Sequence, residues 1–256
     1  MPKNKTKVAD DKVVSKTLYF SNGNAKLGKN VSIFSLPAGF SCPGSHLCQA
    51  FSNRLTGKIT DGENQQFRCY AASMEAIYPT LRSHLWDNFE LIKNCKNKEE
   101  ITALFERDGP KWGILRIGVS GDYFSQMYFD AIIDLAKRNP ALLVYSYTKS
   151  LHFWVARLGQ IPKNFVLTAS RGGKYDYLIE KYKLKEVSVI KDLKTVKSVI
   201  QKIQSGKPPK NIDFDDKLAQ NPKVKKFKIL LHGTQSPKTQ SSQSWQLIKK
   251  TVGGYS

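Results

Sequence analysis

Four cysteines are the residues of this chain best suited to chemistry, and three of them lie in one short region. Cys42 and Cys48 flank a loop that contains Pro43 and Gly44, and Cys69 stands where a long amphipathic pattern begins. Disulfides belong mainly to secreted proteins. The first thirty residues lack the apolar segment of a signal peptide, so we expect a reducing compartment and free thiols. Cys42, Cys48 and Cys69 are therefore predicted to bind a metal, the alternative being ordinary buried cysteines.

Thiolates in this pattern can hold either zinc or an iron–sulfur cluster. Structural zinc sites usually take ligands from a tight C-x₂₋₄-C knuckle, whereas five residues separate Cys42 from Cys48. A four-iron cluster is a larger object and needs ligands that are spread more widely. The spacing favours a [4Fe-4S] cluster and leaves zinc open.

Apolar runs of strand length alternate with helical patterns along the chain. From Tyr70 to Asn94 apolar residues recur at helical spacing, with a break or kink expected at Pro79. This alternation predicts parallel βαβ units, and right-handed crossovers would wind them into an α/β partial (β/α)6 barrel. The six expected strands are 31–36, 113–119, 142–147, 165–168, 187–190 and 227–231.

We expect one α/β domain over residues 31–256, preceded by a basic N-terminal extension over residues 1–30. Within the extension, the pattern indicates a short strand at Thr17–Phe20 and a turn at Ser21–Asn24.

Functional residues of such folds gather at the carboxyl ends of the strands. That rule places Cys42, Cys48 and Cys69 on one rim. Cys95 ends the first helical region, roughly 20 Å away at about 1.5 Å per residue, and is expected to be structural. His232 ends the last strand on the same rim, which makes it the candidate for a fourth ligand. A histidine that only supports the loop is the alternative.

Ser120 and Asp122 follow the second expected strand in the turn Gly118-Val-Ser-Gly-Asp122. A serine between a strand and a helix is the setting of a nucleophile elbow, and His232 could serve as its base. Asp122 breaks the full Gly-x-Ser-x-Gly pattern, and the plainer reading is a turn whose aspartate caps the helix. Ser120 and Asp122 are nevertheless the candidate catalytic residues.

Four further polar residues follow the next two strands: Tyr147, Lys149, Ser170 and Arg171. Together they could form a basic, partly aromatic mouth that binds a cofactor, a phosphate or a base. Ordinary polar residues of a loop rim are the alternative.

The chain carries 41 Lys and Arg against 21 Asp and Glu, a net charge of +20. Such an excess attracts polyanions and makes nucleic acid the expected partner class, although much of it could lie in solvated tails and linkers. Apolar runs long enough to span a bilayer are missing from the sequence, so no membrane partner is expected.

Several motifs together resemble a bacteriophage family usually called "gene product eighty-eight-like". The resemblance covers roughly Val31 to Lys250. It implies a phage-encoded protein in the cytoplasm of an infected bacterium, with a partial barrel like that of radical S-adenosylmethionine enzymes and a [4Fe-4S] cluster on Cys42, Cys48 and Cys69. The motifs are Cys42-Pro43-Gly44 with Cys48, Cys69-Tyr70-Ala71, Arg116 to Gly121-Asp122, Tyr147-Thr148-Lys149, and His232-Gly233-Thr234-Gln235.

The compact C-x₃-C-x₂-C loop of radical S-adenosylmethionine enzymes is absent from the sequence. This absence argues against cleavage of S-adenosylmethionine, although the Ser120-Gly121-Asp122 turn stands where a glycine-rich motif would hold its amino group. The leading expectation is redox or radical-type chemistry on a small molecule or a nucleic acid. The alternatives are an esterase-like hydrolase that uses the rim serine, and a non-catalytic nucleic-acid-binding protein stapled by the cluster.

Overall fold

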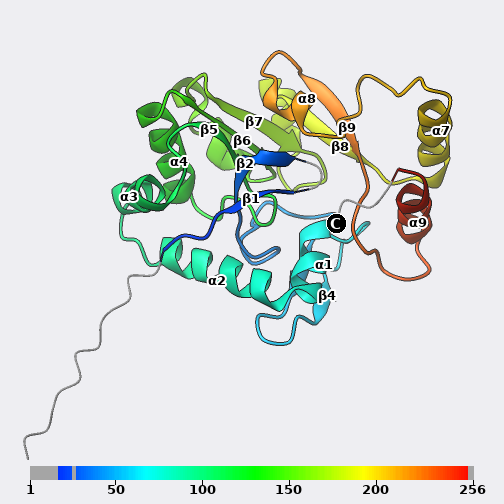
Figure 1. Cartoon of the computed structure of the whole chain (residues 1–256), viewed down its shortest axis with the longest axis horizontal. Helices are drawn as coiled ribbons and strands as arrows, with labels where there is room; N and C mark the ends of the chain where they lie inside the picture. Colours follow the sequence, from blue (N-terminus) through cyan, green and yellow to red (C-terminus); the bar gives the residue numbers. More distant parts are fainter. Residues whose placement is uncertain (1–16, 25–26, 253–256) are drawn as a thin grey trace, which may run out of the picture.

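The computed structural model describes residues 17–24 and 27–252, which fold around one mostly parallel sheet of seven strands (Figure 1). The row begins with β1, which runs antiparallel to β2, and all the later strands are parallel and adjacent in chain order. In sheet order the strands are β1 (Ser21–Asn24), β2 (Gly28–Phe34), β5 (Gly113–Ile117), β6 (Leu142–Thr148), β7 (Phe165–Ser170), β8 (Glu186–Ile190) and β9 (Lys226–Leu230).

The six expected strands are present as β2, β5, β6, β7, β8 and β9, so the mixed α/β class is confirmed. The expected turn at Ser21–Asn24 is wrong, because these residues form β1, and Thr17–Phe20 is not a strand. β1 pairs with β2 through its backbone with a register shift near Asn22, which explains why its polar sequence resembles a turn. The expected domain boundary at residue 31 falls inside β2.

The helices connect successive strands, and the connection after β2 is the longest. It holds a hairpin of β3 (Ala50–Ser52) and β4 (Ile59–Asp61) before three helices. The first helical region breaks at Tyr78, as Pro79 predicts. The helices are α1 (Tyr70–Ile77), α2 (Pro79–Lys93), α3 (Lys98–Asp108), α4 (Gln126–Arg138), α5 (Leu151–Val155), α6 (Tyr177–Tyr182), α7 (Leu193–Gln204), α8 (Lys217–Gln220) and α9 (Gln240–Val252), with a 3₁₀ turn at Leu158–Gln160.

The main core lies between one face of the sheet and helices α2, α3 and α4. Phe34 of β2 and Phe105 of α3 are fully buried there, with ring centroids 4.6 Å apart. The short helix α8 covers part of the opposite face, where Ala219 packs among Tyr145, Val166 and Phe227. At the far end of the molecule α7 packs against α9 (Figure 1). None of the helices in the described residues is long and apolar enough to cross a membrane.

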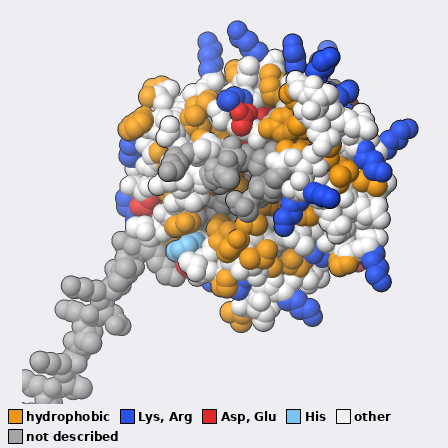
Figure 2. All heavy atoms as spheres, turned by 45° about the vertical axis from the view of Figure 1, so that its right-hand side comes forward, with side chains coloured by type: hydrophobic (Ala, Val, Ile, Leu, Met, Phe, Trp, Pro, Cys, Tyr) orange, Lys and Arg blue, Asp and Glu red, His pale blue; other side chains and the backbone are white. Residues whose placement is uncertain are grey.

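Basic side chains concentrate in the last third of the chain. Residues 191–252 contain fourteen lysines and four aspartates. On the face that Figure 2 shows, the Lys and Arg side chains stand out separately around the periphery, with hydrophobic side chains between them. The positive charge is thus distributed over the surface of that face.

Replacement of Phe34 tests the main core. Phe34→Ala should lower the free energy of unfolding by about 3 to 5 kcal/mol, because it opens a cavity among packed aromatic rings. Leu55→Ala is the matched control, since Leu55 is 85% exposed in a loop and its loss should change stability by less than about 0.5 kcal/mol. Chemical denaturation measures both, and equal losses would contradict the assigned core.

Candidate functional site

A cavity of about 220 Å³ opens at the carboxyl ends of the parallel strands. Loops that follow the first and the last parallel strands both contribute to its wall, as expected for a parallel α/β fold. Cys42, Cys48 and Cys69 all line it, so the structure brings the three predicted thiols to one place. The other predicted site residues in its lining are Asp122, Tyr147, Lys149, Ser170 and His232.

The thiols influence one another electrostatically. Burial raises the pKa of the Cys42 thiol, and the nearby Asp122, Cys69 and Cys48 raise it further. Burial likewise raises the pKa of Cys69, and Cys48 adds to that shift. Cys69 also precedes the first turn of α1, where backbone N–H groups favour the thiolate. Cys42 and Cys69 are therefore held protonated unless a cation compensates the charge of their thiolates.

The Cys42–Cys48 loop is fixed to the loops after β6 and β7. The Gly44 carbonyl accepts a hydrogen bond of 2.9 Å from the Lys174 backbone N–H, and the Leu47 N–H donates to the Gly172 carbonyl, also at 2.9 Å. Gly44 passes so close to Lys149 that a Cβ at Gly44 would lie 2.2 Å from the Lys149 carbonyl oxygen. The positions of Cys42 and Cys48 thus depend on strands far along the chain.

Asp122 serves chiefly as a hydrogen-bond acceptor that organises the loop after β6. Its carboxylate accepts from the Thr148 hydroxyl at 2.6 Å, and from the backbone N–H groups of Tyr123 at 2.7 Å, Lys149 at 2.8 Å and Ser150 at 3.2 Å. Burial raises its pKa, and these hydrogen bonds counter the shift. Asp122 thus holds the exits of β5 and β6 together.

Ser120 lies away from the thiols. Its hydroxyl donates to Glu75 Oε1 at 2.8 Å, and its backbone N–H donates to the Ser35 hydroxyl at 3.2 Å. It lines two smaller cavities, whereas His232 lines the large one. The structure therefore engages the candidate nucleophile with a buried carboxyl group and does not bring it to the candidate base.

Glu75 holds the start of the cysteine loop. Its Oε1 also accepts from the Ala38 backbone N–H at 2.8 Å, and the side chain is fully buried in α1. Burial raises the pKa of Glu75 to about 7, although hydrogen bonds from Ala38 and Ser120 and the nearby Arg82 oppose the shift. One carboxyl group therefore links the exit of β2, the exit of β5 and α1.

The predicted cofactor-binding residues divide into two groups. Tyr147, Lys149 and Ser170 line the cavity, and the Lys149 ammonium donates a hydrogen bond to the Ser170 hydroxyl. The Arg171 side chain instead pairs with Glu186 and Glu180.

Arg116 and Asp216 also line the cavity; neither was predicted as a site residue, and Arg116 was named only as the start of a motif. Arg116 of β5 is 5% exposed, and its guanidinium carbon lies 4.1 Å from the centroid of the Tyr147 ring. Asp216 Oδ2 lies 3.5 Å from Arg116 Nε. An arginine inside an otherwise apolar strand is a signal that could have identified this pair, because a buried charge needs a partner or a function.

The His232 ring faces Tyr70, with ring centroids 4.7 Å apart. Its Nδ1 lies 3.1 Å from the Leu230 carbonyl oxygen. Donation from Nδ1 leaves the lone pair of the neutral imidazole on Nε2, which is the atom that would ligate a metal. The fourth cysteine, Cys95, lies beyond the end of α2, and its thiol contacts the Leu91 carbonyl oxygen at 3.4 Å.

Within residues 17–24 and 27–252, no group of three or more His, Cys, Asp and Glu side chains is arranged to hold a metal ion.

The sequence model of a family described as "Gene product 88" matches residues 12–246. This chain belongs to that family. It is 29% identical over 159 residues to the "Gene 88 protein" of Mycobacterium phage L5, an alignment that covers 57% of this chain and 59% of that protein. The chain thus covers less than two thirds of this relative's length. No solved structure matches it.

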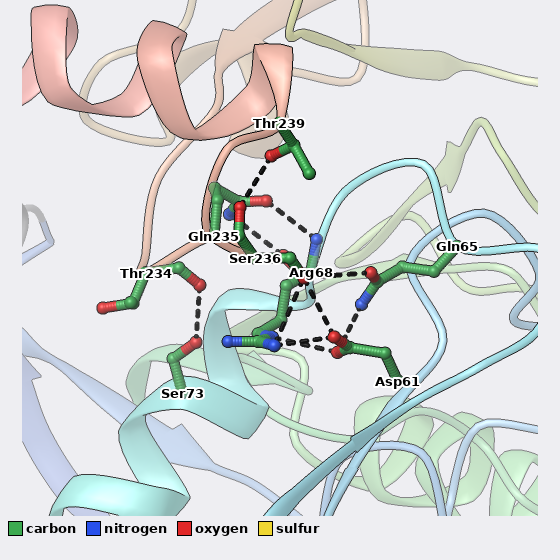
Figure 3. A network of polar contacts seen from close by, with 8 residues as sticks. All are labelled: Asp61, Gln65, Arg68, Ser73, Thr234, Gln235, Ser236 and Thr239. Atoms are coloured by element: carbon green, nitrogen blue, oxygen red, sulfur yellow. Dashed lines mark hydrogen bonds and ion pairs between the residues drawn. The ribbon is translucent and has the colours of Figure 1, made fainter.

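Two motifs that carry the resemblance to the Gene product 88 family meet beside the cavity (Figure 3). The Gln235 amide accepts a hydrogen bond from the Arg68 N–H at 2.8 Å and donates to the Arg68 carbonyl at 3.2 Å. Next to it, the Ser73 hydroxyl donates to the Thr234 carbonyl at 3.0 Å. The Arg68 guanidinium binds both carboxylate oxygens of Asp61, at 2.6 and 2.9 Å. The segment of Cys69 is thereby joined to the segment of His232.

The close approach of Gly44 generates a prediction for this Gene product 88 protein. Gly44→Ala should lower the free energy of unfolding by about 1 to 3 kcal/mol, because the added methyl group overlaps the Lys149 backbone. Gly159→Ala is the matched control, since a Cβ at Gly159 meets nothing within 4 Å. Denaturant titration compares the two, and equal stabilities would show that the cysteine loop tolerates displacement.

Glu75 generates a second prediction, on pH. The folded-state pKa of about 7 exceeds the ordinary value of 4.5, so the folded protein loses stability as the pH rises from about 4.5 to about 7 and Glu75 must ionise. Glu75→Gln removes this ionisation. Across that interval the free energy of unfolding of Glu75→Gln, relative to that of the wild type, should therefore rise by up to roughly 3 kcal/mol. The exposed Glu63→Gln is the control, and unfolding titrations at several pH values decide whether only Glu75→Gln shows the trend.

Proposed function

We propose that the cavity holds a [4Fe-4S] cluster on Cys42, Cys48 and Cys69, and that the cluster supports redox or radical-type chemistry on a small molecule in the same cavity. The observation that carries the proposal is the meeting of three thiols from two separate segments in one cavity. Such clusters are usually held by four cysteine thiolates, so three of them would leave one iron for a further ligand.

The electrostatics of the thiols support a bound metal centre. Burial and mutual repulsion raise the pKa values of Cys42 and Cys69, and metal ions are the usual means of stabilising adjacent thiolates in a protein. His232 lines the same cavity and would supply a fourth ligand through Nε2. An alternative occupant of that position is the small molecule itself.

The fold supports the same proposal. Six parallel strands adjacent in chain order, with the exits of the first and last joined through Gln235, are what a partial (β/α)6 barrel of the radical S-adenosylmethionine type would have. The wide cysteine spacing still argues against S-adenosylmethionine cleavage, so we do not include that reaction in the proposal. The phage origin of the relative and the reduced thiols point to work in the cytoplasm of an infected bacterium.

The side chains of the cavity have separate tasks in this proposal. When bound, the cluster would supply one-electron chemistry. The apolar walls, which include Phe67, Tyr70 and Leu231, keep water from the reacting groups. Asp122 and Glu75 hold the loops that carry the thiols. Lys149 and Arg116 bring positive charge to the cavity wall.

The two alternative functions stay predictions. An esterase would need a base beside Ser120, whereas the Ser120 hydroxyl donates a hydrogen bond to Glu75. Nucleic-acid binding rests on the net charge of +20 and on the fourteen lysines of residues 191–252. Such binding would be salt-dependent.

Anaerobic reconstitution with iron and sulfide tests the proposal. The wild type should bind about four iron and four sulfide per chain and show the broad sulfur-to-iron absorption band. Cys42→Ser, Cys48→Ser and Cys69→Ser should each remove most of the iron and the band. Cys95→Ser is the matched control and should leave both unchanged, because Cys95 lies outside the cavity.

Stoichiometric zinc in place of iron and sulfide would overturn the cluster. Equal iron content in Cys95→Ser and Cys69→Ser would do the same. His232→Ala separates the two models for the fourth ligand: a changed electron paramagnetic resonance spectrum of the reduced cluster supports ligation by His232, and an unchanged spectrum excludes it.

A further inference from the structure

We infer that the cavity also binds a small organic anion with a planar group, held by Arg116 and Lys149 against Tyr147. The inference deepens the proposed function because it names the class of its small molecule. The observations behind it are nonetheless separate from the thiols.

Arg116 is the first observation. Only 5% of the Arg116 surface is exposed, and the residue lines the cavity. A guanidinium has five N–H donors. One nitrogen donates to the Ile117 carbonyl at 3.2 Å, while Nε has no hydrogen-bond partner among the described residues. A buried donor without an acceptor is costly, which indicates that an acceptor enters the cavity.

Asp216 compensates the charge of Arg116 only in part. Its nearest oxygen lies 3.5 Å from Arg116 Nε, beyond the usual length of a charged hydrogen bond. The same carboxylate accepts from the Tyr145 hydroxyl at 3.2 Å and the Tyr147 hydroxyl at 3.0 Å. Asp216 therefore orients the two tyrosines as well as the arginine, and the guanidinium keeps capacity for a second anion.

Lys149 adds a second positive charge to the cavity wall. Its ammonium donates to the neutral Ser170 hydroxyl, and the ion pairs found among the described residues include none with Lys149. Asp122 lies near enough to interact with it electrostatically, but that carboxylate already accepts four hydrogen bonds from other donors. Arg116 and Lys149 thus bring two positive charges to one cavity, and the carboxylates near them already accept hydrogen bonds from other groups.

The remaining walls define the rest of the ligand. The Tyr147 ring lies under the Arg116 guanidinium, and the Phe67 and Tyr70 side chains also line the cavity. Aromatic walls favour a flat group by stacking. The cavity volume of about 220 Å³ includes the space at the thiols, so the ligand occupies only part of it. Either a phosphate or a carboxylate would satisfy the two cations.

Isothermal titration calorimetry on the full, anaerobically reconstituted chain tests the inference. Adenosine 5′-monophosphate and benzoate probe phosphate and carboxylate, and adenosine and benzamide are their uncharged counterparts. At least one anion should bind about tenfold or more tightly than its counterpart, because a charged hydrogen bond contributes about 1.5 to 3 kcal/mol. Which of the two anions binds identifies the charged group.

Lys149→Gln should weaken binding of that anion about tenfold or more. Lys174→Gln is the matched control, because Lys174 follows the same rim but is exposed outside the cavity, and its affinity should stay within about twofold of the wild type. Arg116→Lys keeps the charge and removes the planar fork, and should also weaken binding. If Arg116→Lys fails to fold, the comparison of Lys149→Gln with Lys174→Gln still tests the inference.

Failure of both anions to bind, equal affinity for the uncharged counterparts, or equal effects of Lys149→Gln and Lys174→Gln would overturn the inference. Iron and sulfide are measured in the same samples. A cluster-loaded chain that binds neither anion overturns the ligand alone, and a chain that binds the anion without taking up iron overturns the cluster alone.

Discussion

The cavity depends on the pairing of the Gln235 amide with both backbone groups of Arg68. The first and last parallel strands, β2 and β9, lie at opposite ends of a row of six, so side-chain contacts must join their exit loops; this pairing is one, and the Ser73–Thr234 hydrogen bond is another. Gly233 makes the approach possible: a Cβ there would lie 2.9 Å from the Tyr70 Cα, and its φ of +84° suits glycine. A side-chain amide thus closes the wall between the segments that carry Cys69 and His232.

Two buried carboxyl groups hold other loops around the cavity together. Asp122 and Glu75 collect backbone N–H groups and hydroxyls from loops that have no regular secondary structure. Such loops would otherwise leave polar groups unsatisfied in a dry interior. Glu75, with a pKa of about 7, is partly protonated near neutral pH and can act as both acceptor and donor. The thiols are therefore positioned by a polar framework more than by apolar packing.

Much of the fold could be predicted from the sequence, because buried parallel strands appear as apolar runs and Pro79 marks a helix start. The rim was predictable for the same reason. It was harder to predict which of the rim side chains line the cavity. Successive residues of a strand point to opposite faces, so Ser170 at the end of β7 lines the cavity while Arg171 pairs with Glu186. The strand β1 was missed because its stability comes from backbone pairing, and Asp216 because a carboxylate in a short loop segment has no pattern that marks it.

The cavity contains features that an ordinary core avoids. Three thiols line it, Arg116 Nε lacks a hydrogen bond within the described residues, and Asp216 adopts a left-handed backbone with φ of +61°. The last two features cost folding free energy in the absence of a ligand. A bound metal centre would use the thiols and a bound anion would satisfy Arg116, and binding to the folded state alone stabilises it. The two proposed occupants therefore support each other through the stability of one cavity, although they contact different residues in its wall.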